Sequence, residues 1–213
     1  ALKADVDFTL KIGGGDAIRD MYDARSVGID HLLAPMIESP FALQKYLRSV
    51  REVFPADEVE STHFLINVET VGTCELLEEM LSIPEIGQLD GIVVGRGDLV
   101  ESLGHARTEV DSEEVFELTA KILSAAKKRG LETIIGGGVS VNSLKFLNRL
   151  EKGTLDRYET RKICYSCPDA LGESAAMGLE LGLEFELYWL SNKRNYYRAI
   201  STEDHKRIDV LEK

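Results

Sequence analysis

The chain has 213 residues, 44% of them hydrophobic, which allows one sizeable core but not two ordinary enzyme domains, so we expect a single domain over residues 1–213. Its formal net charge of −12 and its 25 dispersed basic residues argue against nucleic-acid partners and anionic lipid surfaces. The sequence has neither the roughly 18 to 20 apolar residues of a membrane span nor a signal peptide, so we expect no membrane contact and a cytoplasmic location.

Short apolar runs recur along the chain, and each ends at Gly, Pro or a charged residue. Near-continuous Ile, Leu and Val without alternation is typical of strands buried on both faces, as in a parallel sheet. The predicted strands are a weak one at 9–12, clear ones at 31–35, 64–69, 91–95 and 132–136, and a last candidate at 158–165.

Helices are expected between these strands. Ser39 followed by Pro40 is typical of an N-cap with proline at the first helical position. The segment 111–114 resembles a capping box and opens a helix that stops at Gly130. Apolar and aromatic residues over 179–213 predict a C-terminal helical extension.

The order of strands and helices predicts an α/β fold with a parallel sheet and right-handed crossovers. A closed barrel is favoured over a doubly wound sheet, because polar residues follow several strands in succession. Only about six strands are visible, whereas a barrel needs eight. We therefore expect a (β/α)8 TIM barrel that lacks its first two strands in this chain, followed by the helical extension at 179–213.

Two carboxylates lie at the ends of consecutive predicted strands. Glu69 closes the strand at 64–69, and Asp98 follows the strand at 91–95 by three residues. Both would point into the mouth of a barrel, where hard oxygen ligands are suited to Mg2+ or Mn2+. The alternative is that each acid caps the helix that follows it.

The segments 33–39, 66–70 and 89–99, with Ser102-Leu103-Gly104, include or adjoin these two acids. Together they resemble the HpcH/HpaI aldolase and citrate lyase β-subunit family. The resemblance covers roughly residues 9–140. The segment 96–99 is also similar to the metal-binding turn of pyruvate kinase, a member of the same phosphoenolpyruvate/pyruvate barrel superfamily.

This resemblance implies that Glu69 and Asp98 bind a divalent metal, Mg2+ or Mn2+. It also implies that backbone N–H groups of Gly95, Arg96, Gly97 and Asp98 bind the substrate carboxylate, which agrees with the close approach that glycine allows. The implied enzyme is a carbon–carbon lyase that cleaves or forms a 2-oxo-acid, with the metal stabilising a pyruvate enolate.

The chain departs from the family pattern at three positions. Lys11 replaces an arginine that usually binds substrate oxygens, and Asn67 replaces an expected glutamine. Arg96 replaces a more usual proline and could supply the missing cation; the alternative is a solvated arginine near the rim. We therefore predict catalytic roles for Lys11 and Arg96 and substrate binding by Asn67.

No histidine occupies the position of the family's general base. His31 and His63 begin strands and are expected to be structural, whereas His105 follows the predicted metal turn and is the only one expected near the site. These departures leave two alternatives open. One is a citrate-lyase-like enzyme that acts on an acyl-CoA, and the other is a repurposed, non-catalytic barrel that binds metal and a 2-oxo-acid.

Three further patterns carry weaker predictions. The glycine runs at 13–15 and 136–138 could cradle a phosphate, but they lack a complete nucleotide-binding motif, and room for substrate is the simpler interpretation. Cys164 and Cys167 form a C-x-x-C pair without the partners of a zinc or thioredoxin-like site. The apolar surface of 179–213 predicts that part of it packs against another subunit of a homo-oligomer.

Overall fold

Seven strands form one curved sheet in which neighbours along the chain are also neighbours in space. The computed structural model describes residues 6–213. Strands β1 to β6 are parallel, and β7 runs antiparallel to β6. The strands are β1 (Thr9–Lys11), β2 (His31–Ala34), β3 (His63–Val68), β4 (Gly91–Gly95), β5 (Glu132–Gly136), β6 (Arg157–Glu159) and β7 (Cys164–Ser166).

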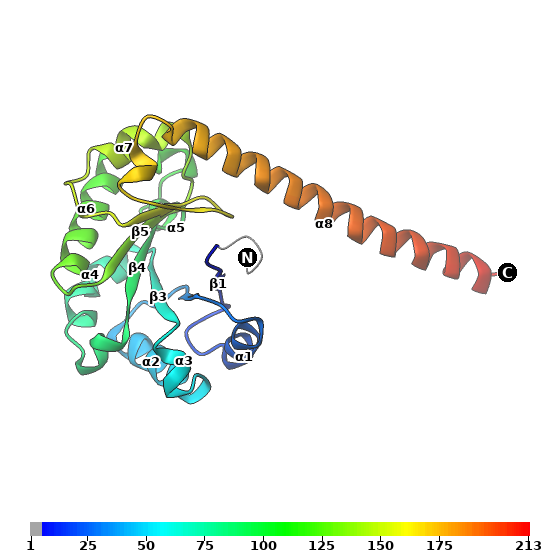
Figure 1. Cartoon of the computed structure of the whole chain (residues 1–213), viewed down its shortest axis with the longest axis horizontal. Coiled ribbons are helices and arrows are strands. Elements are labelled where there is room, and N and C mark those ends of the chain that lie inside the picture. The colour runs from blue at the N-terminus through cyan, green and yellow to red at the C-terminus, as the bar shows by residue number, and fades with distance from the viewer. Residues whose placement is uncertain (1–5) are drawn as a thin grey trace.

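Helices lie along the outer side of the curved sheet, and one long helix projects away from it (Figure 1). The α-helices are α1 (Ile18–Val27), α2 (Pro40–Val53), α3 (Ala56–Val59), α4 (Val71–Met80), α5 (Arg96–Ser102), α6 (Glu113–Lys127), α7 (Leu144–Asn148) and α8 (Ala175–Leu211). Short 3-10 turns are η1 (Pro84–Gln88), η2 (Arg107–Glu109), η3 (Val141–Ser143) and η4 (Asp169–Leu171).

The described residues therefore form a half-barrel, and a complete eight-stranded barrel is not seen in them. The alternating α/β order and the parallel pairing are confirmed. The single strand predicted at 158–165 is wrong, because the chain turns back between β6 and β7. In that turn, Thr160 N–H donates to the carbonyl of Ile163, and Ile163 N–H donates to Thr160 Oγ1 at 3.2 Å.

The two faces of the sheet carry different side chains, since successive residues of a strand point to opposite sides. One set packs under the helices and forms the main core. The other set, on the concave face, forms a small separate cluster of Leu33, Leu65, Val93 and Ile134. Polar residues at the carboxyl ends of the strands continue this concave face, which positions the candidate site.

The structure confirms one of the two predicted helix N-caps and contradicts the other. Ser39 caps α2, because its Oγ accepts a hydrogen bond from Ala42 N–H at 3.1 Å. The capping box predicted at 111–114 is wrong: Ser112 is the N-cap residue of α6, but its side chain makes no capping bond. Asp111 instead pairs with Arg96 and accepts a hydrogen bond from the Ser143 hydroxyl.

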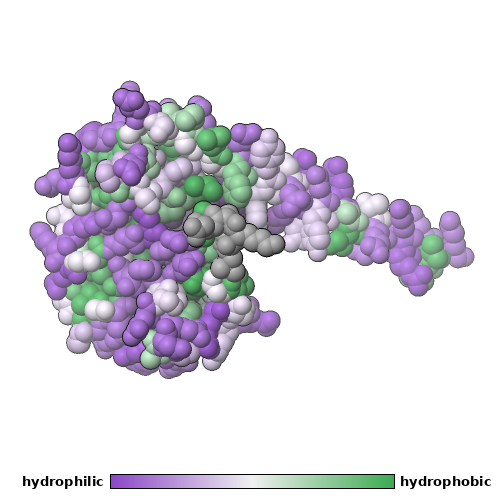
Figure 2. All heavy atoms as spheres, in the orientation of Figure 1, coloured by the Kyte–Doolittle hydropathy of each residue, from purple (hydrophilic) through white to green (hydrophobic). Residues whose placement is uncertain are grey.

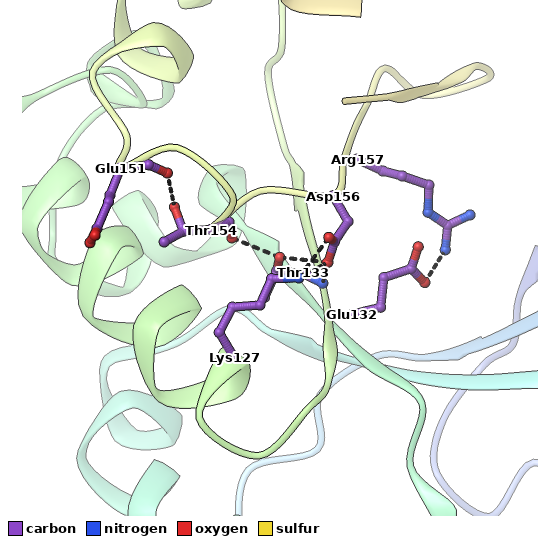
Figure 3. A network of polar contacts seen from close by, with 7 residues as sticks. All are labelled: Lys127, Glu132, Thr133, Glu151, Thr154, Asp156 and Arg157. Carbon is purple, nitrogen blue, oxygen red and sulfur yellow. Dashed lines mark hydrogen bonds and ion pairs between the residues drawn. The ribbon is translucent and has the colours of Figure 1, made fainter. Parts of the chain in front are cut away.

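Aspartates tie neighbouring strands together at their amino ends. Asp30, Asp90 and Asp156 each precede a strand and accept a backbone N–H near the start of the strand before it, at 2.7, 2.7 and 2.8 Å. Figure 3 shows that Asp156 also receives the Lys127 ammonium and the Thr133 hydroxyl. These carboxylates fix the register of adjacent strands.

The long helix α8 is anchored to the body through its first turns, and Lys162 Nζ also lies 5.2 Å from the centroid of the Trp189 ring further along the helix. The Tyr165 hydroxyl donates to the carbonyl of Gly178 at 3.0 Å, and a Cβ at Gly182 would lie 1.9 Å from that hydroxyl. The buried residues of α8 are Ala175, Leu179 and Gly182. The rest projects as an arm on which apolar patches alternate with hydrophilic ones (Figure 2). Among residues 6–213, no helix is both long and apolar enough to span a membrane.

Candidate active site

Glu69 is a buried carboxylate at the end of β3, only 2% exposed. Its Oε1 accepts a hydrogen bond from Met36 N–H at 2.9 Å, and its Oε2 accepts one from Asn67 Nδ2 at 2.6 Å. Lys11 Nζ lies 3.6 Å from the same Oε2. The alternative that Glu69 caps the next helix is wrong, because Thr70 caps α4.

A pair of glycines forms the floor beneath two carboxylates. Gly95 at the end of β4 pairs directly with Gly136 at the end of β5. A Cβ at Gly95 would lie 2.8 Å from Glu69 Oε2, and a Cβ at Gly136 would lie 2.8 Å from Glu159 Oε1. The side chains of Glu69 and Glu159 therefore lie above this glycine pair, and they come from the strands on either side of it, β3 and β6.

Asp98, the second predicted metal ligand, lies in the first turn of α5 and is half-exposed. Arg107 Nη2 donates to its Oδ1 at 2.9 Å, while Arg107 Nε donates to Glu101 at 2.6 Å. Sequence reasoning missed Arg107, because its approach to Asp98 depends on how the loop after α5 folds back. Asp98 thus follows the strand next to that of Glu69, as predicted, and is engaged by an arginine.

The residues present are chemically suited to a hard divalent cation. Glu69 and Asp98 supply carboxylate oxygens, and the buried Oδ1 of Asn67 has no hydrogen-bond partner among the described residues. Oxygen donors of this kind are what Mg2+ and Mn2+ prefer. Over residues 6–213, no group of three or more His, Cys, Asp or Glu side chains is arranged to hold a metal. Water or substrate would have to complete the coordination.

Arg96 is fully buried, so the alternative of a solvated arginine at the rim is wrong. Its guanidinium pairs with Asp111, donates to the carbonyls of Gly136 and Gly137 at 3.3 Å each, and lies 4.6 Å from the centroid of the Phe146 ring. These contacts give Arg96 a structural role. The predicted catalytic contact stays a prediction, and it would require several of these bonds to break.

The glycine run at 136–138 brings two loops into contact. Gly137 has a φ of +78°, and a Cβ there would lie 2.3 Å from the backbone nitrogen of Gly97. Only glycine permits this approach. The loop therefore packs against the turn that contains Gly97 and Asp98, and this contact, not a phosphate cradle, explains the glycine.

The histidines do not supply a base near Glu69. His31 and His63 begin β2 and β3, with ring centroids 4.9 Å apart, so both lie at the amino ends of their strands as predicted. Burial lowers the pKa of His31 to about 4, helped by Arg157, and keeps the ring neutral. His105 is exposed and pairs with Glu114 at 3.0 Å.

The two cysteines of the C-x-x-C pair lie at opposite ends of β7: Cys164 pairs with Glu159 beside the hairpin turn, and Cys167 N–H donates to the carbonyl of Asp156 at the far end. Cys164 and Cys167 are both free thiols. Burial raises the pKa of Cys167 to about 11, which disfavours the reactive thiolate.

Glu159 is the acid that sequence reasoning did not single out. It ends β6 and is half-buried. Burial raises the pKa of Glu159 to about 7, although Lys11 and Arg157 oppose that rise. The available signal was its position two residues after Arg157, on the same face of a short strand, but the strand was predicted with the wrong extent.

Fold and site together define a partial parallel α/β barrel with acidic and basic side chains at the carboxyl ends of its strands. The HpcH/HpaI aldolase/citrate lyase family matches residues 14–144, more than half of the chain. The chain belongs to this family, and the predicted resemblance is confirmed.

Solved structures share the fold at low sequence identity. An HpcH/HpaI aldolase from Desulfitobacterium hafniense DCB-2 aligns with a TM-score of 0.61 and 16% identity over 85% of this chain and 74% of that one. The citrate synthase SbnG aligns with a TM-score of 0.61 and 12% identity over 91% of this chain and 76% of that one. A comparison with proteins of curated function found no match.

A third solved structure, an HpcH/HpaI aldolase/citrate lyase family protein from Burkholderia cenocepacia J2315, aligns with a TM-score of 0.55 and 18% identity. That alignment covers 66% of this chain and 63% of the Burkholderia protein. This chain therefore spans less than two thirds of that protein's length.

Proposed function

We propose that this protein is a metal-dependent carbon–carbon lyase that cleaves or forms a 2-oxo-acid through a pyruvate enolate. The observation that carries the proposal is the setting of Glu69, a buried carboxylate 3.6 Å from the Lys11 ammonium. It lies beside the amide oxygen of Asn67, which has no hydrogen-bond partner among residues 6–213. Its strand neighbours the strand that leads to Asp98. Membership of a family of aldolases and lyases supports the same reaction class.

Each residue has a distinct role in this proposal. Glu69 and Asp98 would hold Mg2+ or Mn2+, which when bound supplies a Lewis acid for the substrate oxygens. The Lys11 ammonium attracts the substrate's negatively charged oxygens. Asn67 Oδ1 can accept a hydrogen bond from a substrate hydroxyl or from water. Burial of Glu69 keeps its carboxylate in one orientation.

The proposal is tested by deuterium exchange of the methyl protons of pyruvate in D2O, followed by proton NMR. We expect exchange to require Mn2+ or Mg2+ and to fall about 10- to 100-fold in Lys11→Ala, because the cation no longer stabilises the enolate. Lys45→Ala is the matched control, since Lys45 is a surface lysine paired with Asp16. Exchange at the full rate in excess chelator would contradict the metal-enolate proposal.

A non-catalytic barrel that binds metal and a 2-oxo-acid is the second candidate. The ion pair between Asp98 and Arg107 favours it, because that pair competes with a metal for Asp98. Tight binding of pyruvate in the presence of Mn2+, without methyl exchange, would support this candidate over the enzyme.

A further inference from the structure

Glu159 lies at the carboxyl end of β6, on the concave face that carries the candidate site. Its carboxylate leans over Gly136, and Glu69 leans over the paired Gly95. Neighbouring strands are about 4.8 Å apart. Gly95 and Gly136, which lie beneath the two carboxylates, are therefore separated by only about one strand spacing. Glu69 and Glu159 therefore face the same small region of the concave surface.

The partners of the two acids differ. Glu69 is fixed by Met36, Asn67 and Lys11. The backbone of Glu159 pairs with Cys164 of β7, but among residues 6–213 its carboxylate makes no hydrogen bond or ion pair. Glu132, the other acid of β5 and β6 on this face, is paired with Arg157 at 2.6 Å. Of the acids of β5 and β6 on the concave face, Glu159 is thus the one whose carboxylate is free to contact a substrate.

Several charged or titratable groups act on Glu159. Lys11 from β1 and Arg157 from β6 favour the charged form of the Glu159 carboxylate. Cys164 from β7 also lies close enough to interact electrostatically with Glu159. Glu69 from β3 lies on the opposite side of the glycine pair. Lys11 interacts with both Glu69 and Glu159, so an anionic substrate paired with Lys11 would lie close to both carboxylates.

We propose that Glu159 is the group that exchanges a proton with the carbon next to the carbonyl of a bound 2-oxo-acid. The inference rests on the proposed function. The carboxylate takes the proton, the electron pair of the C–H bond becomes the carbon–carbon double bond of the enolate, and the carbonyl electrons move onto oxygen. In the direction of cleavage, the carboxylate accepts the proton of the C4 hydroxyl as the C3–C4 bond breaks and the aldehyde forms. The resulting carboxylic acid then gives a proton to the enolate carbon, the enolate oxygen re-forms the carbonyl, and pyruvate is released.

The protonation equilibrium of Glu159 suits this role. Burial raises the pKa of Glu159 to about 7, against the pull of Lys11 and Arg157. A group that titrates near neutral pH is available both as a base and as an acid.

The decisive variant is Glu159→Gln, which keeps the shape of the side chain and removes its base. We expect methyl exchange of pyruvate to fall about 100-fold or more, and the wild-type decline in rate below about pH 7 to disappear. The affinity for Mn2+ should stay unchanged. Glu132→Gln is the matched control, because it alters an acid on the same face that is already paired with Arg157, and it should exchange within about threefold of wild type.

A second measurement separates this inference from the proposed function. Binding of oxalate, a stable mimic of the enolate, should draw a fraction of a proton onto the wild-type protein near pH 7, measured by calorimetry in two buffers of different ionisation enthalpy. Glu159→Gln should show no such uptake. Absence of exchange in wild type would overturn the proposed function and the catalytic role of Glu159 with it, whereas exchange in wild type that is fully retained in Glu159→Gln would overturn the inference alone. Exchange and proton uptake at wild-type levels in Glu159→Gln would overturn the inference.

Discussion

At the scale of single residues, Arg96 is the cation most deeply built into the fold. Its guanidinium joins α5 to the loop after β5 and to Asp111 at the start of α6, and it lies over the ring of Phe146. Burying a charge is costly unless its hydrogen bonds are satisfied. The carbonyls of Gly136 and Gly137 help to satisfy them, so the arginine fixes the loops that frame Gly97 and Asp98.

Arg96→Met should destabilise the protein by about 3–5 kcal/mol, because it leaves Asp111 and the loop carbonyls without their partner. The change is measured by urea unfolding followed by circular dichroism. Arg48→Met, at an exposed position of α2, is the control and should change stability by less than about 0.5 kcal/mol. A loss below about 1 kcal/mol for Arg96→Met would show that the buried guanidinium does not hold these loops.

Asp98 and Arg107 should affect metal affinity in opposite directions. Asp98→Ala removes a proposed ligand and should weaken Mn2+ binding at least about tenfold. Arg107→Ala removes a competing cation and should strengthen binding by a few-fold, because an exposed ion pair contributes little energy. Isothermal titration with Mn2+ measures both changes. Unchanged affinity in Asp98→Ala would remove Asp98 from the site.

Some residues of the candidate site could be predicted from the sequence, and others could not. Glu69 was predictable because it follows a recognisable strand and parallel strands bring their carboxyl ends together. Lys11 and Asn67 were singled out by the family resemblance, and the structure places both beside Glu69. Arg107 and Glu159 were not predictable. The first depends on the path of a loop, and the second lies in a three-residue strand that no apolar run marks.

At the scale of elements, the curved sheet depends on carboxylates that precede alternate strands. Asp30, Asp90 and Asp156 each bind the backbone of the preceding strand. The clear strands could be predicted from continuous Ile, Leu and Val. The hairpin of β6 and β7 could not, because its turn through Thr160 and Ile163 contains neither Gly, Pro, Asn nor Asp.

Asp156→Asn tests this view of the sheet. Burial opposes ionisation of Asp156, but hydrogen bonds from Lys127 and Thr133 outweigh it and hold the pKa of Asp156 below its usual value. Because the folded pKa is the lower one, the carboxylate stabilises the fold above the unfolded pKa, and this stability is lost as pH falls through the folded pKa. We expect Asp156→Asn to cost about 1–3 kcal/mol at pH 7, and much less at pH 3, in urea unfolding. An equal difference at both pH values would contradict the assignment.

At the scale of the whole molecule, the half-barrel and its projecting helix differ in how well they bury apolar surface. The body has a continuous core under its helices. Helix α8 has 37 residues, and none beyond Gly182 is buried. An isolated helix in water gains little stability from its backbone alone. The exposed apolar residues of α8 beyond Gly182 include Leu183, Phe185, Leu187, Tyr188, Trp189, Leu190, Tyr196 and Tyr197.

We propose that this arm packs against a second copy of the chain, because eight large apolar side chains exposed along one helix exceed what a monomer ordinarily leaves in water. Light scattering at micromolar concentration should show a dimer or larger assembly. Leu187→Glu combined with Leu190→Glu should shift it to monomer without unfolding the body, since both residues lie beyond the turns anchored by Tyr165. Glu184→Gln with Glu186→Gln, on the same stretch of helix, is the control and should stay assembled. A monomeric wild-type protein would refute the proposed interface, and an oligomer unaffected by the paired glutamates would place the contact elsewhere.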